Sequence, residues 1–320
     1  MLNRKYVPIL VTFGLLAVMF AAGSFRYTGF FSAQVLYNLL IDNSFLIITA
    51  VGMTFVIISG GIDLSVGSVI ALTTMICATL VERHGWSPAL VIPMVLIFGA
   101  LFGTLLGAII HYFKIQPFIV TLAGMFLARG ICYIISIDTI TVTNGFFTRV
   151  AQTKVSLPGG NISINVIIAL VVVLAAIYLA HYTRFGRNVY AIGGSEQSAL
   201  LMGLPVARTK ILVYTFSGFC SSLAGVVFTF YMLSGYGLHA MGLELDTIAA
   251  VVIGGTLLTG GVGYVAGTLI GVLIQGVIQT IISFEGTLSS WWTKIVIGLL
   301  LFVFILFQRL LSDRRVTLKT

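Results

Sequence analysis

Charged residues are scarce in this chain of 320 residues: only 8% are Asp, Glu, Lys or Arg, whereas 59% are hydrophobic. Soluble domains carry charges on about a quarter of their residues. A soluble globule with so few charges could not cover its apolar surface, so that class is excluded. Apolar runs of about 20 residues, the length that crosses a bilayer core, recur along the whole chain. The composition therefore predicts an all-α, polytopic integral membrane protein.

Acidic and reactive side chains are also rare. The chain has nine Asp and Glu residues, and only Asp63 falls in an interrupted apolar run, which is too few carboxylates for a proton relay. The four histidines lie at the ends of runs or in loops, and the sequence contains no H-E-x-x-H, G-x-S-x-G or G-x-x-x-x-G-K-[ST] motif. Catalysis and direct ATP binding are therefore disfavoured, and we expect no catalytic residue and no cofactor.

The chain has three cysteines, Cys77, Cys132 and Cys220, and each lies in an apolar run. None of them forms a C-x-x-C pair. We interpret them as small residues of membrane helices, so neither a disulfide nor a metal site is predicted.

Ten apolar runs predict ten spans. They cover residues 6–24, 43–59, 64–81, 89–110, 117–137, 163–181, 211–233, 247–259, 262–284 and 291–308. With the N-terminus inside, 11 of the 17 Lys and Arg residues fall in inside segments and five in outside segments, while Arg129 lies within a span. Cytoplasmic loops carry the excess of Lys and Arg, so both termini are predicted to be cytoplasmic. The same bias explains the net charge of +8 without any nucleic-acid partner.

The N-terminal stretch, residues 1–24, imitates a signal peptide, with Arg4 and Lys5 before an apolar run. Many further spans follow, so an uncleaved first helix is expected. Residues 1–320 are then interpreted as a single transmembrane domain.

Glycines interrupt the runs at two places. "GGIDL" separates 43–59 from 64–81, and the run 247–259 continues through "GGTLLTGGVG". Each place is either a tight hairpin or a broken helix, and a broken helix persists only where protein or a water-filled cavity covers its free backbone groups. In transporters such interruptions lie near the substrate pathway. The candidate pathway residues are Gly60, Gly61, Asp63, Gly254 and Gly255.

Asp63 has two interpretations, because it either caps the helix that begins near Leu64 or faces the pathway. Arg129 lies in the middle of a span, where an arginine faces a polar interior or extends toward the membrane surface, and no partner can be named from the sequence. Two stripes of glycine at four-residue spacing predict close helix packing, either within the subunit or across a dimer. They are Gly99, Gly103 and Gly107, and Gly263, Gly267 and Gly271.

One loop, about 182–210, differs from the rest of the chain: "RFGRNVYAIGGSEQSALLMGLPVARTKI" carries five charged residues. Ser195 is a good N-cap, Glu196 favours a first turn, Gly203 suits the position after a helix and Pro205 prevents continuation. These features predict a helix of about seven residues, which is marginal in water by itself. Its exposed apolar residues either dock on a partner or rest on lipid headgroups. They are Leu200, Leu201, Met202 and Leu204.

Four stretches occur together in this order: "SGGIDLSVGSV" at 59–69, "QPFIVTLAGMFLARG" at 116–130, "TRFGRNVYAIGGSEQSALLMGLPVARTKILVYTFSG" at 183–218, and "IAAVVIGGTLLTGGVGYVAGTLIGVLIQG" at 248–276. The pattern resembles the permease subunits of bacterial ABC sugar importers of the ribose and xylose type. The resemblance spans nearly the whole chain, and it is greatest to the smaller permease of the galactofuranose importer.

The resemblance implies a multi-pass protein of the bacterial inner membrane that forms the pathway of an ATP-driven importer of a monosaccharide, galactofuranose or a similar sugar. It also implies three partners: an ATP-binding subunit, a periplasmic sugar-binding protein and a second, different permease chain. The implied residues that couple to the ATPase are Glu196, Ala199, Leu200, Met202 and Gly203. The usual E-A-A start of this helix is here Glu196-Gln197-Ser198-Ala199. The departure concerns how the helix packs on the ATPase.

Two other classes of protein stay open on the residues alone. A self-contained secondary carrier or channel for a small polar solute needs no short apolar docking helix in the cytoplasm. A membrane scaffold needs no glycine-broken spans.

Topology supplies the first testable prediction. Cysteines introduced at Gly160 and at Ser195 are expected to react with a membrane-impermeant thiol reagent from opposite sides, Gly160 from outside and Ser195 from inside. Reaction of both positions from the same side would contradict the ten-span topology.

Overall fold

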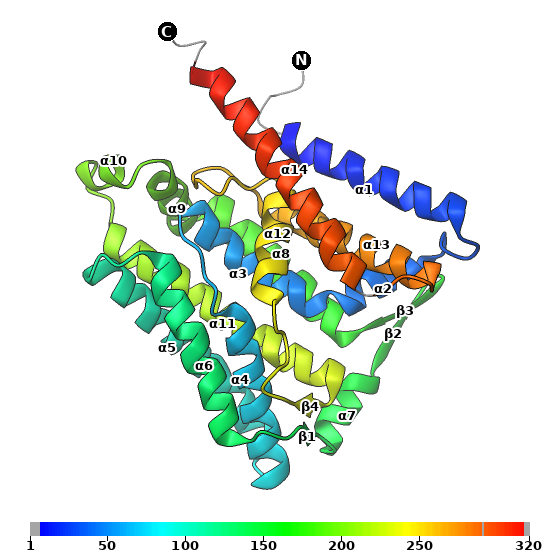
Figure 1. Cartoon of the computed structure of the whole chain (residues 1–320). Helices are drawn as coiled ribbons and strands as arrows, with labels where there is room; N and C mark the ends of the chain where they lie inside the picture. Colours follow the sequence, from blue (N-terminus) through cyan, green and yellow to red (C-terminus); the bar gives the residue numbers. More distant parts are fainter. Residues whose placement is uncertain (1–6, 290, 317–320) are drawn as a thin grey trace.

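The computed structural model describes residues 7–289 and 291–316, and helices make up most of these ranges (Figure 1). The helices are α1 (Val7–Arg26), α2 (Ala33–Asp42), α3 (Ser44–Ile58), α4 (Val66–Ala78) with a π-helical extension (Thr79–Arg83), α5 (Pro88–Tyr112), α6 (Pro117–Ile135), α7 (Gly145–Gln152), α8 (Ile164–Tyr182), α9 (Arg184–Gly194), α10 (Glu196–Leu201), α11 (Val206–Met232), α12 (Leu243–Ile253), α13 (Val265–Glu285) and α14 (Trp291–Val316). The strands are β1 (Ile140–Thr141), β2 (Lys154–Leu157), β3 (Gly160–Ser163) and β4 (Ser234–Gly235).

The strands form two small antiparallel pairs in loops, β1 with β4 and β2 with β3. The β2–β3 pair is a hairpin in which Leu157 lies opposite Gly160. Neither pair extends into the bundle, so the helices form the core. The all-α, polytopic fold predicted from composition is confirmed.

Seven helices are long and apolar enough to cross a membrane, or eight if α2 and α3, which meet at 57°, form one span. Every one of the ten predicted spans contains a helix. Of the described residues of α14, Trp291–Leu306 form a shorter apolar helix, and α12 has only 11 residues.

The boundaries predicted for the eighth span were wrong. It was expected at 247–259, but α12 begins four residues earlier and ends six residues earlier. The helix stops because Gly255, Gly260 and Gly261 have positive φ angles, which belong to a turn. The non-helical segment 236–242 precedes α12, which begins directly after it at Leu243. Helices α2, α7 and α9 were not predicted from the sequence.

Helices α3, α4 and α11 form the centre of the bundle. Of the 15 residues of α3, 14 are buried, as expected for a helix that is apolar on all sides. The 27-residue helix α11 packs against α3, α4 and α5. Hydroxyl groups inside this core bond to the preceding turn of their own helix, for example Thr54 to the carbonyl of Ala50 and Thr229 to that of Gly225.

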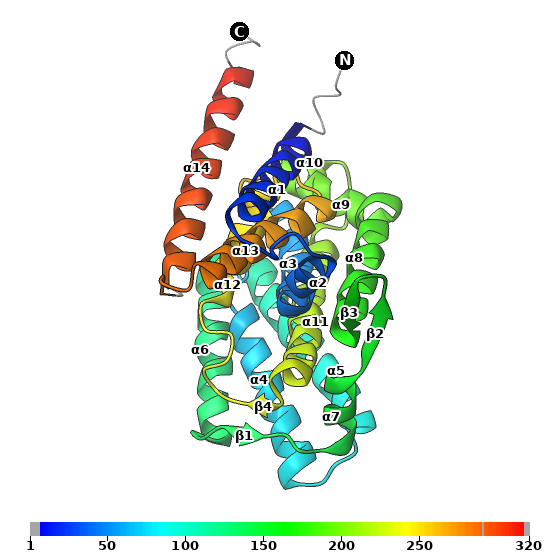
Figure 2. The same cartoon turned by 90° about the vertical axis from the view of Figure 1, so that its right-hand side faces the viewer.

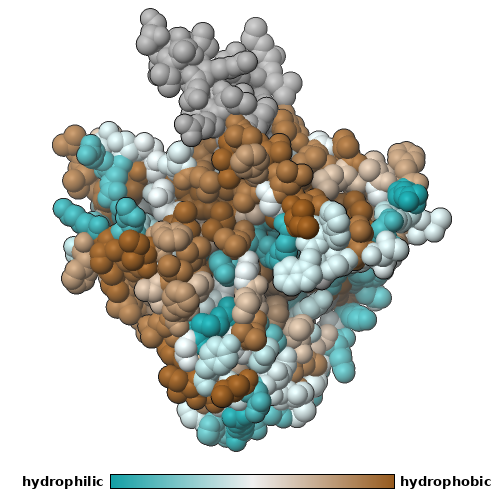
Figure 3. Space-filling view, viewed as in Figure 1, coloured by the Kyte–Doolittle hydropathy of each residue, from teal (hydrophilic) through white to brown (hydrophobic). Residues whose placement is uncertain are grey.

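The two ends of the bundle carry different elements (Figures 1 and 2). One end, the α10 face, carries α9 and α10, the start of α1 and the end of α14. The opposite end, the hairpin face, carries the β2–β3 hairpin, α7 and the β1–β4 pair. The side between them is largely apolar, whereas hydrophilic residues gather toward α10 and toward the lower and right-hand edges (Figure 3). Of the basic residues counted as inside, Arg4, Lys5 and Lys319 lie outside the described residues.

Arg129 of α6 finds its partners in the non-helical segment before α12. Its Nη1 donates to the carbonyl oxygens of Gly237 and His239, at 2.6 and 2.7 Å. An arginine inside a bundle is stable when acceptors surround it, and free carbonyls need donors there. The arginine therefore holds the segment in place and determines where α12 begins.

The first glycine stripe lies between α5 and α11. A Cβ at Gly103 would overlap the carbonyl of Tyr214, and one at Gly99 would overlap Ser222 and the carbonyl of Gly218. The prediction of close packing within the subunit is thus confirmed for this stripe. In the second stripe, Gly267 and Gly271 lie against α12. Gly263 precedes α13 and belongs to the turn.

The close approach of α5 to α11 predicts a contrast between two glycines. Gly103→Ala should lower the free energy of unfolding by about 1–3 kcal/mol, because the added methyl group forces the two backbones apart. Gly130→Ala in α6 is the matched control, since nothing lies within 4 Å of its Cβ position. Thermal unfolding in detergent can be followed with a dye that reacts with Cys77, Cys132 and Cys220, which are all buried. Equal melting temperatures for the two variants would contradict the close contact.

Candidate functional sites on the two faces

The loop between α8 and α11 folds into two helices, α9 and α10. Helix α10 has the cap predicted for it, because Ser195 accepts a hydrogen bond from the backbone N–H of Ser198 at 3.2 Å. It ends as predicted, with Gly203 at φ +76 and the N–H of Leu204 donating to the carbonyl of Ala199 at 3.1 Å. The helix has six residues, one fewer than expected.

The large apolar side chains of α10, Leu200 and Leu201, and that of Met202 after it point away from the protein. Leu200, Leu201 and Met202 are 66%, 88% and 67% exposed. Ala199 is fully buried in a small cluster with Ile192 and Val206, so it supports α10 from below. The predicted set thus divides into residues that anchor the helix and residues available to a partner.

Glu196 pairs within its own chain. Its carboxylate lies 2.7 Å from the ammonium group of Lys210 at the start of α11. This ion pair links the first turn of α10 to α11. Glu196 was expected to favour the first turn of the helix and to couple to the ATPase, and the pair with Lys210 was not predicted. The two residues are 14 positions apart, so no helical spacing could reveal the pair.

Helix α9 was missed, although its sequence carried a signal. Thr183 caps it by accepting from the N–H of Gly186 at 3.2 Å. Near its end, Gly193 lies against the carbonyl of Ile58 and the N–H of Gly261, so closely that a Cβ would overlap them. Tyr190 donates a hydrogen bond to the carbonyl of Gly263 at 2.7 Å. Helix α9 therefore joins α10 to both glycine turns, 59–65 and 254–264.

The four predicted pathway glycines have local structural roles. Gly60 and Gly255 have positive φ angles of 83 and 91°, which only glycine adopts without strain. Gly61 lies against the hydroxyl of Tyr214, and Gly254 lies against the backbone of Gly267. The two turns also touch each other, because a Cβ at Gly260 would lie 3.0 Å from the Cα of Gly60.

The two turns differ in kind. Residues 254–264 form a hairpin between α12 and α13, which are packed together. In the other turn, α3 and α4 both pack mainly on α11. The hairpin interpretation therefore applies fully only to 254–264.

Asp63 is buried in the turn 59–65, between α3 and α4. One carboxylate oxygen accepts from the N–H and the hydroxyl of Ser65, at 2.9 and 2.6 Å, and the other accepts from the hydroxyl of Ser217 in α11 at 2.8 Å. The capping interpretation agrees with the contacts to Ser65. The contact with Ser217 adds a tie between the turn and α11 that the sequence did not reveal.

A large cleft opens on the hairpin face, and sequence analysis did not identify it. Its volume is about 600 Å³, within the range of small-molecule sites. It is lined by Asp42, Asn43, Phe45, Leu46, Phe228, Tyr231, Leu243, Asp246, Gln275, Gln279, Ile282, Ser283, Trp291, Thr293, Lys294 and Ile297. Asp42, Asn43, Gln279 and Ser283 also line a neighbouring cavity of about 160 Å³.

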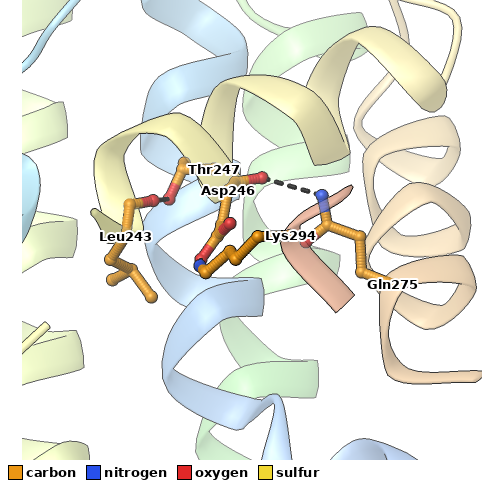
Figure 4. Close-up of polar contacts among 5 residues, drawn as sticks. All are labelled: Leu243, Asp246, Thr247, Gln275 and Lys294. Carbon is orange, nitrogen blue, oxygen red and sulfur yellow. Dashed lines mark hydrogen bonds and ion pairs between the residues drawn. The ribbon is translucent and has the colours of Figure 1, made fainter. Parts of the chain in front are cut away.

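Charged and amide groups meet in this cleft (Figure 4). The ammonium group of Lys294 in α14 forms an ion pair with the carboxylate of Asp246 in α12. Gln275 of α13 donates to the backbone carbonyl of Asp246 at 2.9 Å, and Tyr231 donates to the carboxylate of Asp42 at 3.1 Å. Aromatic rings lie among them, with Phe45 and Phe228 edge to face at 4.8 Å between centroids. This combination of donors, acceptors and ring faces suits a small polar solute.

One signal could have revealed the cleft. Gln275 and Gln279 are four residues apart in "GVLIQGVIQT", so they lie on one face of an otherwise apolar helix. Asp42, Asp246 and Lys294 were treated only as flanking charges. Their convergence depends on three different helices and could not be derived from spacing. Among the described residues, no group of three or more His, Cys, Asp and Glu side chains could hold a metal ion.

Comparison with known proteins gives consistent matches over almost the whole chain. Residues 35–305 match the family described as the permease component of the branched-chain amino acid transport system. The chain is 50% identical to the inner membrane ABC transporter permease protein YjfF of Escherichia coli K12, over 96% of this chain and 93% of that protein. It is 42% identical to the fructose import permease protein FruG of Bifidobacterium longum, over 96% and 92%.

A third relative is the ribose import permease protein RbsC of Haemophilus influenzae, which is 39% identical over 95% of this chain and 94% of that protein. No solved structure matches. The family match covers most of the chain, and each of these relatives aligns along nearly its full length. The chain therefore belongs to the family of permease components of the branched-chain amino acid transport system type.

Proposed function

We propose that the protein is the membrane-spanning permease subunit of an ATP-driven, binding-protein-dependent importer of a monosaccharide in the bacterial inner membrane. The observation that carries the proposal is the exposed apolar surface of Leu200, Leu201 and Met202, together with relatives named as sugar import permeases. The sugar is galactofuranose or a similar one, because the four sequence stretches described above resemble the smaller permease of the galactofuranose importer. Residues 1–320 form one transmembrane domain with both termini cytoplasmic.

Three partners follow from this function: an ATP-binding subunit, a periplasmic sugar-binding protein and a second permease chain of a different kind. The chain has no G-x-x-x-x-G-K-[ST] motif, so ATP hydrolysis belongs to the ATP-binding subunit. The α10 face is then cytoplasmic and the hairpin face periplasmic.

The alternative, a self-contained secondary carrier, fits the contacts less well. Coupling to protons needs a carboxylate that can exchange its hydrogen-bond partners. Asp63 is buried, and both of its oxygens accept hydrogen bonds from Ser65 or Ser217. A carrier also leaves the exposed apolar residues of α10 without a role.

Force from the ATPase reaches the bundle through α9. The ATP-binding subunit contacts Leu200 and Met202, while Ala199 and the ion pair of Glu196 with Lys210 keep α10 in place. Helix α9 then moves with α10, and its last turn rests on both glycine turns. Gly60, Gly61, Asp63, Gly254 and Gly255 are placed by this proposal at the cytoplasmic end of the sugar pathway, where a small shift of either turn opens or closes it.

The docking surface gives a prediction for Gly203. Gly203→Val forces a branched residue into the left-handed conformation, which costs roughly 1–2 kcal/mol. Docking of the ATPase should weaken by about tenfold, since 1.4 kcal/mol is one decade of affinity. The control is Gly29→Val, because Gly29 has a similar φ of +82 on the hairpin face and no atom within 4 Å of its Cβ position.

Retention of the ATPase subunit on purification and sugar-stimulated ATP hydrolysis are the measurements. Glu196→Lys, which places two cations side by side, should reduce both. Wild-type values for Gly203→Val and Glu196→Lys would reject the docking role of α10 and favour a carrier.

The contact of α9 with the turns predicts a difference between two neighbouring glycines. Gly193→Ala should uncouple sugar uptake from ATP hydrolysis, because a methyl group there overlaps the carbonyl of Ile58. Gly194→Ala is the matched control, since its Cβ position is open. Uptake and ATP hydrolysis are measured together on the reconstituted complex. If the two variants lose uptake equally, or neither does, force does not pass through this contact.

A further inference from the structure

We propose that the cleft on the hairpin face is a monosaccharide-binding site of the permease itself, in which Asp246 and Lys294 bind hydroxyl groups of the sugar. The inference rests on the proposed function, because it takes a sugar as the solute. It adds a site at which the permease binds the sugar after the binding protein has released it and before it crosses the membrane.

The polar groups of the cleft match the needs of a neutral polyhydroxylated solute. A sugar hydroxyl both donates and accepts, so it is bound best between a carboxylate and a donor. Asp246 supplies acceptors and Lys294 supplies donors, and they come from different helices. Gln279 and Ser283 of α13 and Asp42 of α2 line the same space.

The charges of the ion pair remain accessible inside this space. The side chain of Lys294 is 50% exposed and that of Asp246 is 18% exposed. An ion pair enclosed on all sides could only join α12 to α14, whereas these two groups line a cavity of about 600 Å³ and can reach a solute within it. The pair itself has opposite signs and no net charge, and Asp42 is the other ionisable Asp, Glu, Lys or Arg residue that lines the cleft.

Aromatic rings complete the match. Tyr231 and Trp291 both line the cleft and are 42% and 74% exposed. The C–H faces of a sugar ring are apolar and can cover such rings while the hydroxyls reach the polar groups. The position of the cleft agrees with this use, because it lies on the face opposite α10, where a binding protein would release its sugar.

Protection from labelling tests the site directly and without ATP. Ser283→Cys places a thiol in the cleft, and the three natural cysteines of the chain are buried. In the complete complex, a panel of D-ribose, D-fructose, D-allose and D-galactose is tested for slowing the reaction of this thiol with a maleimide. At least one sugar should protect it, and Ser156→Cys, exposed on β2 outside the cleft, should stay unprotected. Failure of every sugar that the complex transports to protect Cys at position 283 overturns the inference.

A variant of Asp246 and a matched control test whether this carboxylate binds the sugar. Asp246→Asn, in the Ser283→Cys background, should raise the sugar concentration for half-protection about tenfold or more, because a charge-assisted hydrogen bond is lost. Asp138→Asn is the matched control, an exposed carboxylate outside the cleft. An unchanged half-protection concentration for Asp246→Asn overturns the role of this residue.

A charge swap separates sugar binding from a purely structural ion pair. The double variant Asp246→Lys with Lys294→Asp restores an ion pair between α12 and α14. We expect it to recover thermal stability but not protection by sugar, because acceptor and donor have changed places. Full recovery of protection would show that the ion pair only holds α12 and α14 together, and it would overturn the inference.

The failure of this inference and the failure of the proposed function are distinguishable. If the wild-type complex imports none of the sugars with ATP, the proposed function fails. If it imports a sugar that leaves the thiol at position 283 unprotected, only the binding site in the cleft fails.

Discussion

Wherever this chain leaves a helix inside the bundle, its free backbone groups must find partners, because the apolar surroundings offer no water. Arg129 satisfies this requirement for the segment before α12 by donating to the carbonyls of Gly237 and His239. Asp63 does the same for the turn before α4, where it accepts from the backbone of Ser65 and from Ser217. The broken helices of the permease therefore depend on two ionisable side chains, Arg129 and Asp63, and on the hydrogen bonds that they form with these segments.

These breaks place the functional surfaces at opposite ends. The two glycine turns lie under α9, so they are within reach of whatever binds α10. The start of α12 at Leu243 places Asp246 beside Lys294 of α14 and Gln275 of α13, and all three residues line the cleft. The docking surface and the sugar site that we propose would thus be linked through α12, which begins at the cleft and ends at the turn 254–264.

Close backbone contacts make this linkage stiff. Glycine at 99 and 103 lets α5 lie against α11, and glycine at 254 and 267 does so for α12 and α13. Packed helices of this kind move as units, since their contacts leave no room for gradual adjustment. Movement of α9 is therefore expected to shift whole helices, which is what alternating exposure of a pathway requires.

The all-α membrane fold, the positions of the main spans and the capped helix near Ser195 were predictable from the amino-acid sequence. Each of these depends on local composition or on caps within a few residues, which spacing reveals directly. The position of α12 was predicted wrongly and α9 was missed, because the first is determined by Arg129 from another helix and the second is a short polar helix without an apolar run.

Which distant groups meet depends instead on how the helices pack against one another. The pairs Glu196 with Lys210, Asp63 with Ser217, and Asp246 with Lys294 join residues 14, 154 and 48 positions apart. No periodicity encodes such distances, since the approach of two helices is determined by the small residues between their backbones and by the turns that connect them. The cleft on the hairpin face is lined by residues of six helices, α2, α3, α11, α12, α13 and α14, so it too is a property of the folded bundle alone.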